Sequence, residues 1–76
     1  MIKDKYDLLK YLIAFMSSDT RRFNDPKYKL TQMIGPHKLS EYLTDLKDEG
    51  LINVYIGNEI EILDAGINLA IKLNNW

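Results

Sequence analysis

The sequence contains no cysteine, and this absence removes several kinds of chemistry at once. Disulfide bonds, thiolate metal sites and thiol nucleophiles are all excluded. The chain has a single histidine, no glycine-rich phosphate loop and no histidine pair at metal-ligand spacing. We therefore expect no catalytic residue, no metal ion and no cofactor, and the protein is not predicted to be an enzyme.

Long apolar runs are missing as well. Charged residues crowd the N-terminus, and Lys10 interrupts the most apolar stretch, so neither a signal sequence nor a membrane span of about 20 residues is predicted. A chain without cysteine also suits a reducing compartment. We expect a cytoplasmic protein.

The chain of 76 residues is long enough for one hydrophobic core, and we expect a single domain over residues 1–76. A domain of this size buries only about 60% of the surface that its unfolded chain exposes. A partner subunit can then contribute as much stability as the core itself. A homodimer is therefore expected.

Charge of one sign does not dominate, since the net charge is −1, but the charges are unevenly distributed along the chain. Between residues 19 and 38, five basic residues face two acidic ones, whereas residues 39–76 carry seven acids and two lysines. Non-specific coating of nucleic acid requires many cations, so this balance argues against it. Any contact with DNA should be narrow and oriented.

Apolar residues at helical spacing predict a first helix over residues 4–17, in which Tyr6, Leu9, Ile13 and Met16 form one stripe. A second apolar strip makes this helix more apolar than a small core requires. The helix is therefore expected either to lie buried in the centre of the core or to form a dimer face. The second strip consists of Leu8, Tyr11, Leu12 and Phe15.

The following segment, Ser17–Pro26, is rich in turn-forming residues and is predicted to be a loop.

Two further helices are predicted over Lys27–Ile34 and from Pro36 or His37 to Glu49. Gly35 and Pro36 force a tight turn between them, and Gly50 ends the longer helix as a C-terminal cap. The residues expected to face inward on the longer helix are Leu39, Tyr42, Leu43 and Leu46.

A β-hairpin and a last helix complete the pattern. Residues 52–56 and 59–63 alternate apolar and polar side chains, so each strand should have one solvent-exposed face. Gly57 and Asn58 form the two-residue link between the strands. In the first strand, Val54 and Ile56 are the apolar members. Asp64 can cap a helix over residues 65–74. The fold class is α+β, mainly α.

The order of three helices, a hairpin and a C-terminal helix resembles the winged helix-turn-helix superfamily of small bacterial, archaeal and viral DNA-binding domains. Locally, Leu39-x-x-x-Leu43-x-x-Leu46 followed by Gly50-Leu51-Ile52 resembles the end of a recognition helix leading into the first wing strand. The pattern Ile60-x-Ile62-Leu63-x-x-Gly66-x-x-x-Ala70-x-x-Leu73 is similar to the second wing strand and the final helix.

The resemblance implies sequence-specific binding of double-stranded DNA by a small transcriptional regulator, with helix 37–49 in the major groove of each half-site. The residues expected to contact bases are His37, Lys38, Ser40, Glu41 and Thr44. The residues expected to contact phosphates are Arg21, Arg22, Lys27, Lys29 and Lys47. The wing tip would consist of Tyr55, Gly57 and Asn58, although Glu59 and Glu61 make this wing acidic.

Two further interpretations accompany this one. A homodimer would pair the terminal helices, through Tyr11, Leu12, Phe15, Leu69, Leu73 and Trp76. Alternatively, the acidic second half favours a winged-helix protein–protein interaction module, such as a viral or plasmid modulator, that does not bind DNA.

Overall fold

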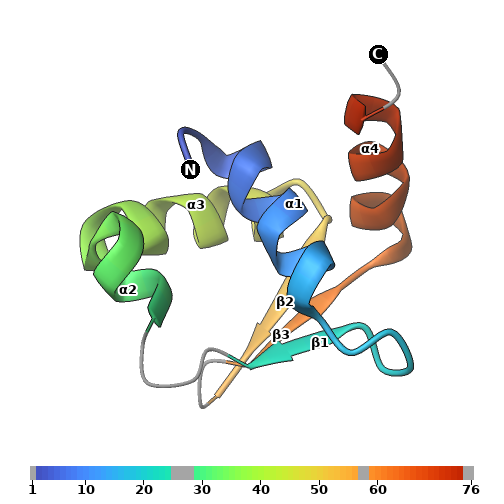
Figure 1. The fold of residues 1–76 in the computed structure, drawn as a ribbon, viewed down its shortest axis with the longest axis horizontal. Coiled ribbons are helices and arrows are strands. Elements are labelled where there is room, and N and C mark those ends of the chain that lie inside the picture. The colour runs from blue at the N-terminus through green and yellow to red at the C-terminus, as the bar shows by residue number, and fades with distance from the viewer. Residues whose placement is uncertain (1, 25–28, 57–58, 75–76) are drawn as a thin grey trace.

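The computed structural model describes residues 2–24, 29–56 and 59–74. Helices cluster over a small sheet, with α4 standing beside them (Figure 1). This arrangement confirms the α+β, mainly helical class. The elements are α1 (Lys5–Phe15), β1 (Arg22–Asn24), α2 (Lys29–Ile34), α3 (Pro36–Asp48), β2 (Ile52–Tyr55), β3 (Glu59–Ile62) and α4 (Asp64–Asn74).

Local sequence signals set the ends of α1 and α3. The Asp7 backbone N–H donates to the Asp4 carboxylate at 2.8 Å, so Asp4 is the N-cap of α1. Pro36 occupies the start of α3, as predicted. After α3, Gly50 adopts a φ of 75°, its N–H donates to the Lys47 carbonyl and the Leu51 N–H donates to the Leu46 carbonyl. This pair of bonds is the Schellman motif, which confirms the predicted glycine cap.

The sheet has three antiparallel strands in the order β1-β3-β2, so β3 is central. The prediction that Ser17–Pro26 is entirely loop was wrong, because it contains β1. Phe23 pairs with Ile60 of β3 and is 5% exposed. Short strands of this kind form because a distant strand offers a free edge and the core offers a site for one aromatic ring, and neither factor is visible locally.

The core lies between α1, the start of α2, the inner side of α3 and the inward face of the sheet. It is built almost entirely from leucine and isoleucine, and Phe23 is its aromatic member. None of the helices in the described ranges is long and apolar enough to cross a membrane. The core residues are Leu8, Leu9, Leu12, Phe23, Leu30, Leu46, Leu51, Ile52, Ile60 and Ile62.

The prediction that the apolar face of residues 52–56 is shielded from solvent is confirmed only at the start of this segment. Ile52 is buried, but Val54 is 39% exposed and Ile56, which follows the end of β2, is 101% exposed. The reason is geometric: Ile52 packs against Leu46 and the rest of the core, while the distal half of β2 is left uncovered. In β3, by contrast, Ile60 and Ile62 are both buried, as predicted.

Candidate nucleic-acid interface

The outward face of α3 is polar and accessible. Leu46 is buried on the inner side of the helix, and its neighbours there pack against the core. All the residues predicted to contact bases therefore lie on one helix and reach solvent. These exposed side chains are His37, Lys38, Ser40, Glu41 and Thr44.

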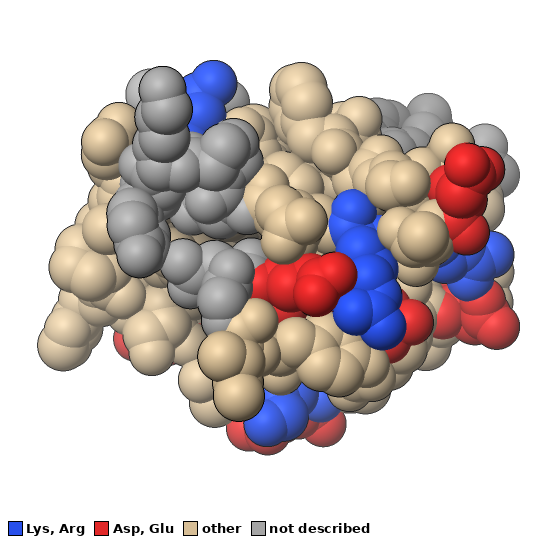
Figure 2. Space-filling model, turned by 90° about the horizontal axis from the view of Figure 1, so that it is seen from below, with Lys and Arg blue, Asp and Glu red and all other residues tan. Residues whose placement is uncertain are grey.

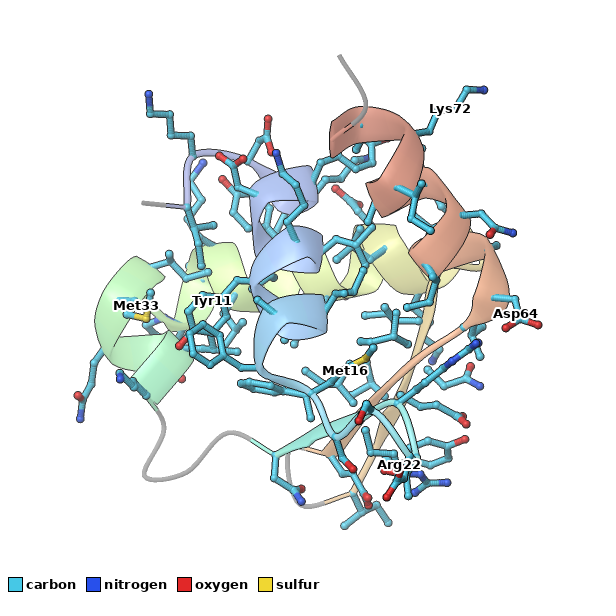
Figure 3. All side chains as sticks on the ribbon, turned by 45° about the vertical axis from the view of Figure 1, so that its right-hand side comes forward. Tyr11, Met16, Arg22, Met33, Asp64 and Lys72 are labelled. Carbon is cyan, nitrogen blue, oxygen red and sulfur yellow. The ribbon has the colours of Figure 1, made fainter. Side chains whose placement is uncertain are left out.

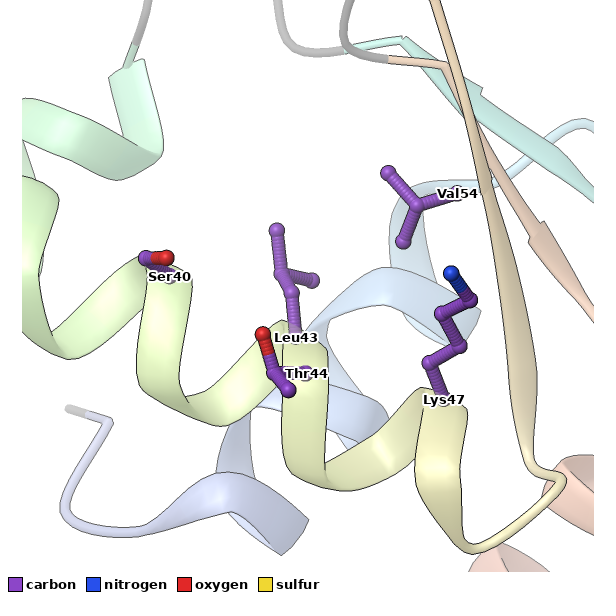
Figure 4. Close-up of a pocket in the computed structure, with 5 residues that line it drawn as sticks. All are labelled: Ser40, Leu43, Thr44, Lys47 and Val54. Carbon is purple, nitrogen blue, oxygen red and sulfur yellow. The ribbon is translucent and has the colours of Figure 1, made fainter.

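A pocket of about 250 Å³ lies between this face of α3 and strand β2. Ser40, Thr44 and Lys47 are spaced by four and three residues, so they share one side of the helix. Leu43 and Val54 supply the apolar walls, from α3 and β2 respectively (Figure 4). Two predicted base-contacting residues and one predicted phosphate-contacting residue thus line the same hollow.

The acids at the C-terminal end of α3 are partly engaged with α1. Glu49, the C-cap residue, accepts a hydrogen bond from the Tyr6 hydroxyl at 3.0 Å and pairs with the Lys5 ammonium at 2.6 Å. These contacts, that of Lys5 foremost, lower the pKa of the Glu49 carboxyl. Asp45 adds to the negative potential at Lys5. Lys5 therefore partly balances the negative charge at the C-terminal end of α3.

Lys38 and Lys47 are differently placed from the two arginines. Both lysines are exposed, and neither forms an ion pair with another described residue. The Lys38 ammonium lies 5.8 Å from the centre of the Tyr42 ring on the same helix. These two cations remain available for a ligand at the α3 surface.

Arg21 is held at the junction of the sheet and α4. Its guanidinium pairs with the carboxylate of Asp64, the first residue of α4. Its backbone has a φ of 56°, its N–H donates to the Ser17 carbonyl and its carbonyl accepts from the Ile62 N–H. This environment gives Arg21 an evident structural role, and its predicted phosphate contact would compete with Asp64.

Arg22 lies on the outer face of the sheet, in a network with residues from the other two strands (Figure 3). Its guanidinium is 3.2 Å from the Glu59 carboxylate and 4.7 Å from the centre of the Tyr55 ring. The hydrogen bond with Glu59 raises the pKa of Arg22. The Tyr55 hydroxyl donates to Glu61 at 2.8 Å, which raises the pKa of Tyr55. Tyr55 thus packs on the neighbouring strand β3.

The structure describes only some of the remaining residues that were predicted to contact phosphates or to form the wing tip. Lys29 is exposed at the start of α2. The predicted contacts of Lys27, Gly57 and Asn58 lie outside the described residues. Figure 2 shows acidic and basic side chains side by side among the described residues of the face seen from below.

The residues predicted to form the dimer interface differ in how exposed they are. Leu12 is 0% exposed, so its assignment to a dimer surface was wrong, because the sheet and α3 already enclose that side of α1. Phe15 is 66% exposed, and the Tyr11 and Phe15 ring centres are 4.7 Å apart. Leu69 and Leu73 are half-buried on α4, and Trp76 lies outside the described residues.

Sequence reasoning missed two parts of the exposed surface. Leu43 packs against the core, as predicted, but it also lines the pocket beside α3. Val54, which was assigned to a buried strand face, lines the same pocket. Ile71, on α4, is 60% exposed. A helical or alternating pattern identifies an apolar face, but it does not tell where the covering element stops.

Comparison of the chain with protein-family models, with curated protein sequences and with solved structures found no match. In the described residues no group of three or more histidine, aspartate or glutamate side chains is arranged to hold a metal ion.

Proposed function

We propose that the chain is a winged helix-turn-helix domain that binds double-stranded DNA sequence-specifically, with the outward face of α3 in the major groove. The observation that carries this proposal is the exposed polar face of α3, on a helix fixed by its other side to the core. This face has hydrogen-bond donors and acceptors and two lysines that form no ion pair with another described residue. The biological role would be that of a small transcriptional regulator.

The topology supports the winged-helix part of the proposal. A strand between the first two helices pairs with the second strand of a hairpin, and the hairpin directly follows α3. The hairpin would be the wing and α3 the recognition helix. The wing carries its acids in a network with Arg22, so the proposal gives the wing no role in base recognition.

Two lysines of α3 provide the test. A labelled duplex selected from a random library is titrated with the protein at several salt concentrations, and binding is followed by fluorescence anisotropy. Each phosphate-contacting lysine contributes about one unit to the slope of log affinity against log salt. Lys47→Ala, at a predicted phosphate contact, should weaken binding and flatten this slope, and Lys38→Ala, at a predicted base contact, should weaken binding to the selected duplex.

Lys72→Ala is the matched control, since it removes the same charge from an exposed site on α4 that projects away from the rest of the molecule (Figure 3). Its affinity and salt slope should equal those of the wild type. Failure to select any duplex at low salt would refute DNA binding. Equal losses in all three variants would show that only the net charge matters and that the α3 face is wrong.

We propose a homodimer as the DNA-binding form, because Phe15 and Ile71 expose large apolar side chains on α1 and α4, two helices that pack on each other. Sedimentation equilibrium should give twice the mass of the chain. Phe15→Glu or Ile71→Glu should shift the protein to the monomer, and a wild-type protein that stays monomeric at high concentration would contradict the proposal.

A protein-interaction module is the second candidate, favoured by the outer face of the sheet. There Glu59 and Glu61 surround Arg22, so this face has a net negative charge that repels a phosphate backbone. A partner that used this face would lose affinity on Glu59→Gln and Glu61→Gln, whereas DNA binding through α3 would not weaken.

A further inference from the structure

The pocket between α3 and β2 combines three kinds of chemistry at one place. Leu43 and Val54 present apolar walls, while Ser40 and Thr44 place hydroxyl groups beside them. Lys47 closes the pocket at the C-terminal end of α3 (Figure 4). The occupant should therefore have a small apolar group next to a hydrogen-bond acceptor, close to a negative charge.

We propose that this pocket receives the major-groove edge of a thymine in the bound DNA, an inference that rests on the DNA-binding function proposed above. Thymine presents its C5-methyl group beside the O4 acceptor in the major groove, and the other bases lack this pair. The methyl group lies against Leu43 and Val54, and a hydroxyl of Ser40 or Thr44 donates to O4. Lys47 contacts the phosphate that flanks the thymine.

The apolar walls separate this occupant from a phosphate group alone. A phosphate binds where several donors or cations converge, and it gains nothing from an isopropyl side chain such as that of Val54. A buried methyl group, in contrast, gains free energy in proportion to the apolar area that it loses to solvent. Val54 is 39% exposed, so the surface that a methyl group would cover is accessible.

The position of the pocket fits the proposed docking of α3. Ser40 and Thr44 belong both to the pocket and to the outward face of the helix, so a base that meets this face lies next to the apolar walls. The pocket is formed by about two turns of α3 and by β2, both anchored in the core through Leu46 and Ile52. It is therefore present before DNA binds.

The test replaces thymine with deoxyuridine, which removes only the C5-methyl group. In a duplex selected for tight binding, each thymine of the site is exchanged in turn. One position should lose affinity about fourfold, the equivalent of one buried methyl group. The same exchange outside the selected site is the control, and 5-methylcytosine placed opposite guanine at the sensitive position should bind better than unmodified cytosine.

Val54→Thr links the methyl effect to the pocket, because it replaces one methyl group of the wall by a hydroxyl with little change in volume. It should shrink the fourfold difference to less than twofold, while Ala14→Ser, an exposed change on α1, should preserve it. Circular dichroism shows whether both variants are folded.

The outcomes distinguish the two levels of the proposal. If no duplex binds at all, the DNA-binding function itself fails. If a duplex binds with a salt dependence that Lys47→Ala reduces, but thymine and deoxyuridine are equivalent at every position, the function stands and the thymine pocket is refuted. A methyl effect that persists in Val54→Thr would also refute it.

Discussion

Gly66 in the first turn of α4 allows a sharp prediction, because a side chain at this position has no room. A Cβ atom built on Gly66 would lie 2.4 Å from the Leu51 carbonyl oxygen and 3.2 Å from a methyl group of Ile62. The obstacle is backbone, so no side-chain rotation can relieve it. The same carbonyl accepts the Leu63 N–H at 3.0 Å, a bond that joins the residue before β2 to the residue after β3.

The magnitude of a Gly66→Ala change follows from three effects. Higher helix propensity favours alanine by at most about 1 kcal/mol. Overpacking costs about 1–3 kcal/mol, and a weakened Leu51–Leu63 hydrogen bond costs about 0.5–1.5 kcal/mol. The free energy of unfolding should therefore fall by about 0.5–3.5 kcal/mol, out of a total on the order of 4–11 kcal/mol for a chain of this size.

Urea unfolding followed by circular dichroism measures this loss. With a slope of about 1 kcal/mol per molar urea for a small domain, the midpoint should fall by about 0.5–3.5 M. Asn68→Ala, an exposed substitution on the same helix, is the control and should leave the midpoint unchanged or raise it slightly. A midpoint for Gly66→Ala at or above that of the wild type would refute the close approach of α4 to Leu51.

Two further predictions concern charged residues with defined backbone or pairing roles. Arg21 has a φ of 56°, a conformation that glycine adopts without strain. Arg21→Gly and Arg21→Ala both lose the pair with Asp64, but the free energy of unfolding, measured in urea, should be about 1 kcal/mol higher for Arg21→Gly. The Glu49 pKa is lowered by Lys5, so the stabilising effect of this carboxylate is fully present above its ordinary pKa of 4.5 and is lost as the pH falls through the lowered value. Urea midpoints should thus differ between wild type and Glu49→Gln at pH 7 and converge at pH 2, and a difference independent of pH would contradict the role of the charge.

The helices could be predicted from the sequence because their signals are local. An apolar spacing of three and four residues, Asp4 before the first turn of α1, and Gly50 after α3 each act within a few residues of the chain. The resulting predictions for α1, α3 and α4 agree with the observed elements to within two residues at each end. The hairpin strands were predictable for the same reason.

What escaped prediction depends on contacts between distant segments. β1 exists because β3 offers it an edge, and Arg22 and Glu61 are partners although 39 positions apart. The pocket beside α3 exists because the cover over β2 stops after Ile52, which leaves Val54 open. Neither property is encoded in the pattern of the segment concerned, so the candidate residues on α3 could be predicted but the shape of the surface beside them could not.

The charges illustrate the same limit and bear on function. Along the chain, a basic stretch over residues 19–38 precedes an acidic half, which suggests a molecule with two oppositely charged ends. In space, the two are combined: Arg21 pairs with Asp64, and Arg22 pairs with Glu59. The acidic half is therefore less repulsive to DNA than its composition indicates, and the basic loop is less attractive.

Lys38 and Lys47 on α3 form no ion pair with another residue that the structure describes, so they carry more of the proposed interaction than the sequence assigned to them. With so few cations available, the affinity for arbitrary DNA should be weak, because non-specific binding rests on the number of neutralised phosphates. Discrimination between DNA sequences must then come from contacts with base edges. Ser40, Thr44 and the apolar walls of the pocket beside them are placed to make such contacts. A regulator of this kind would depend on a second subunit to double these few contacts, which ties the DNA-binding proposal to the homodimer.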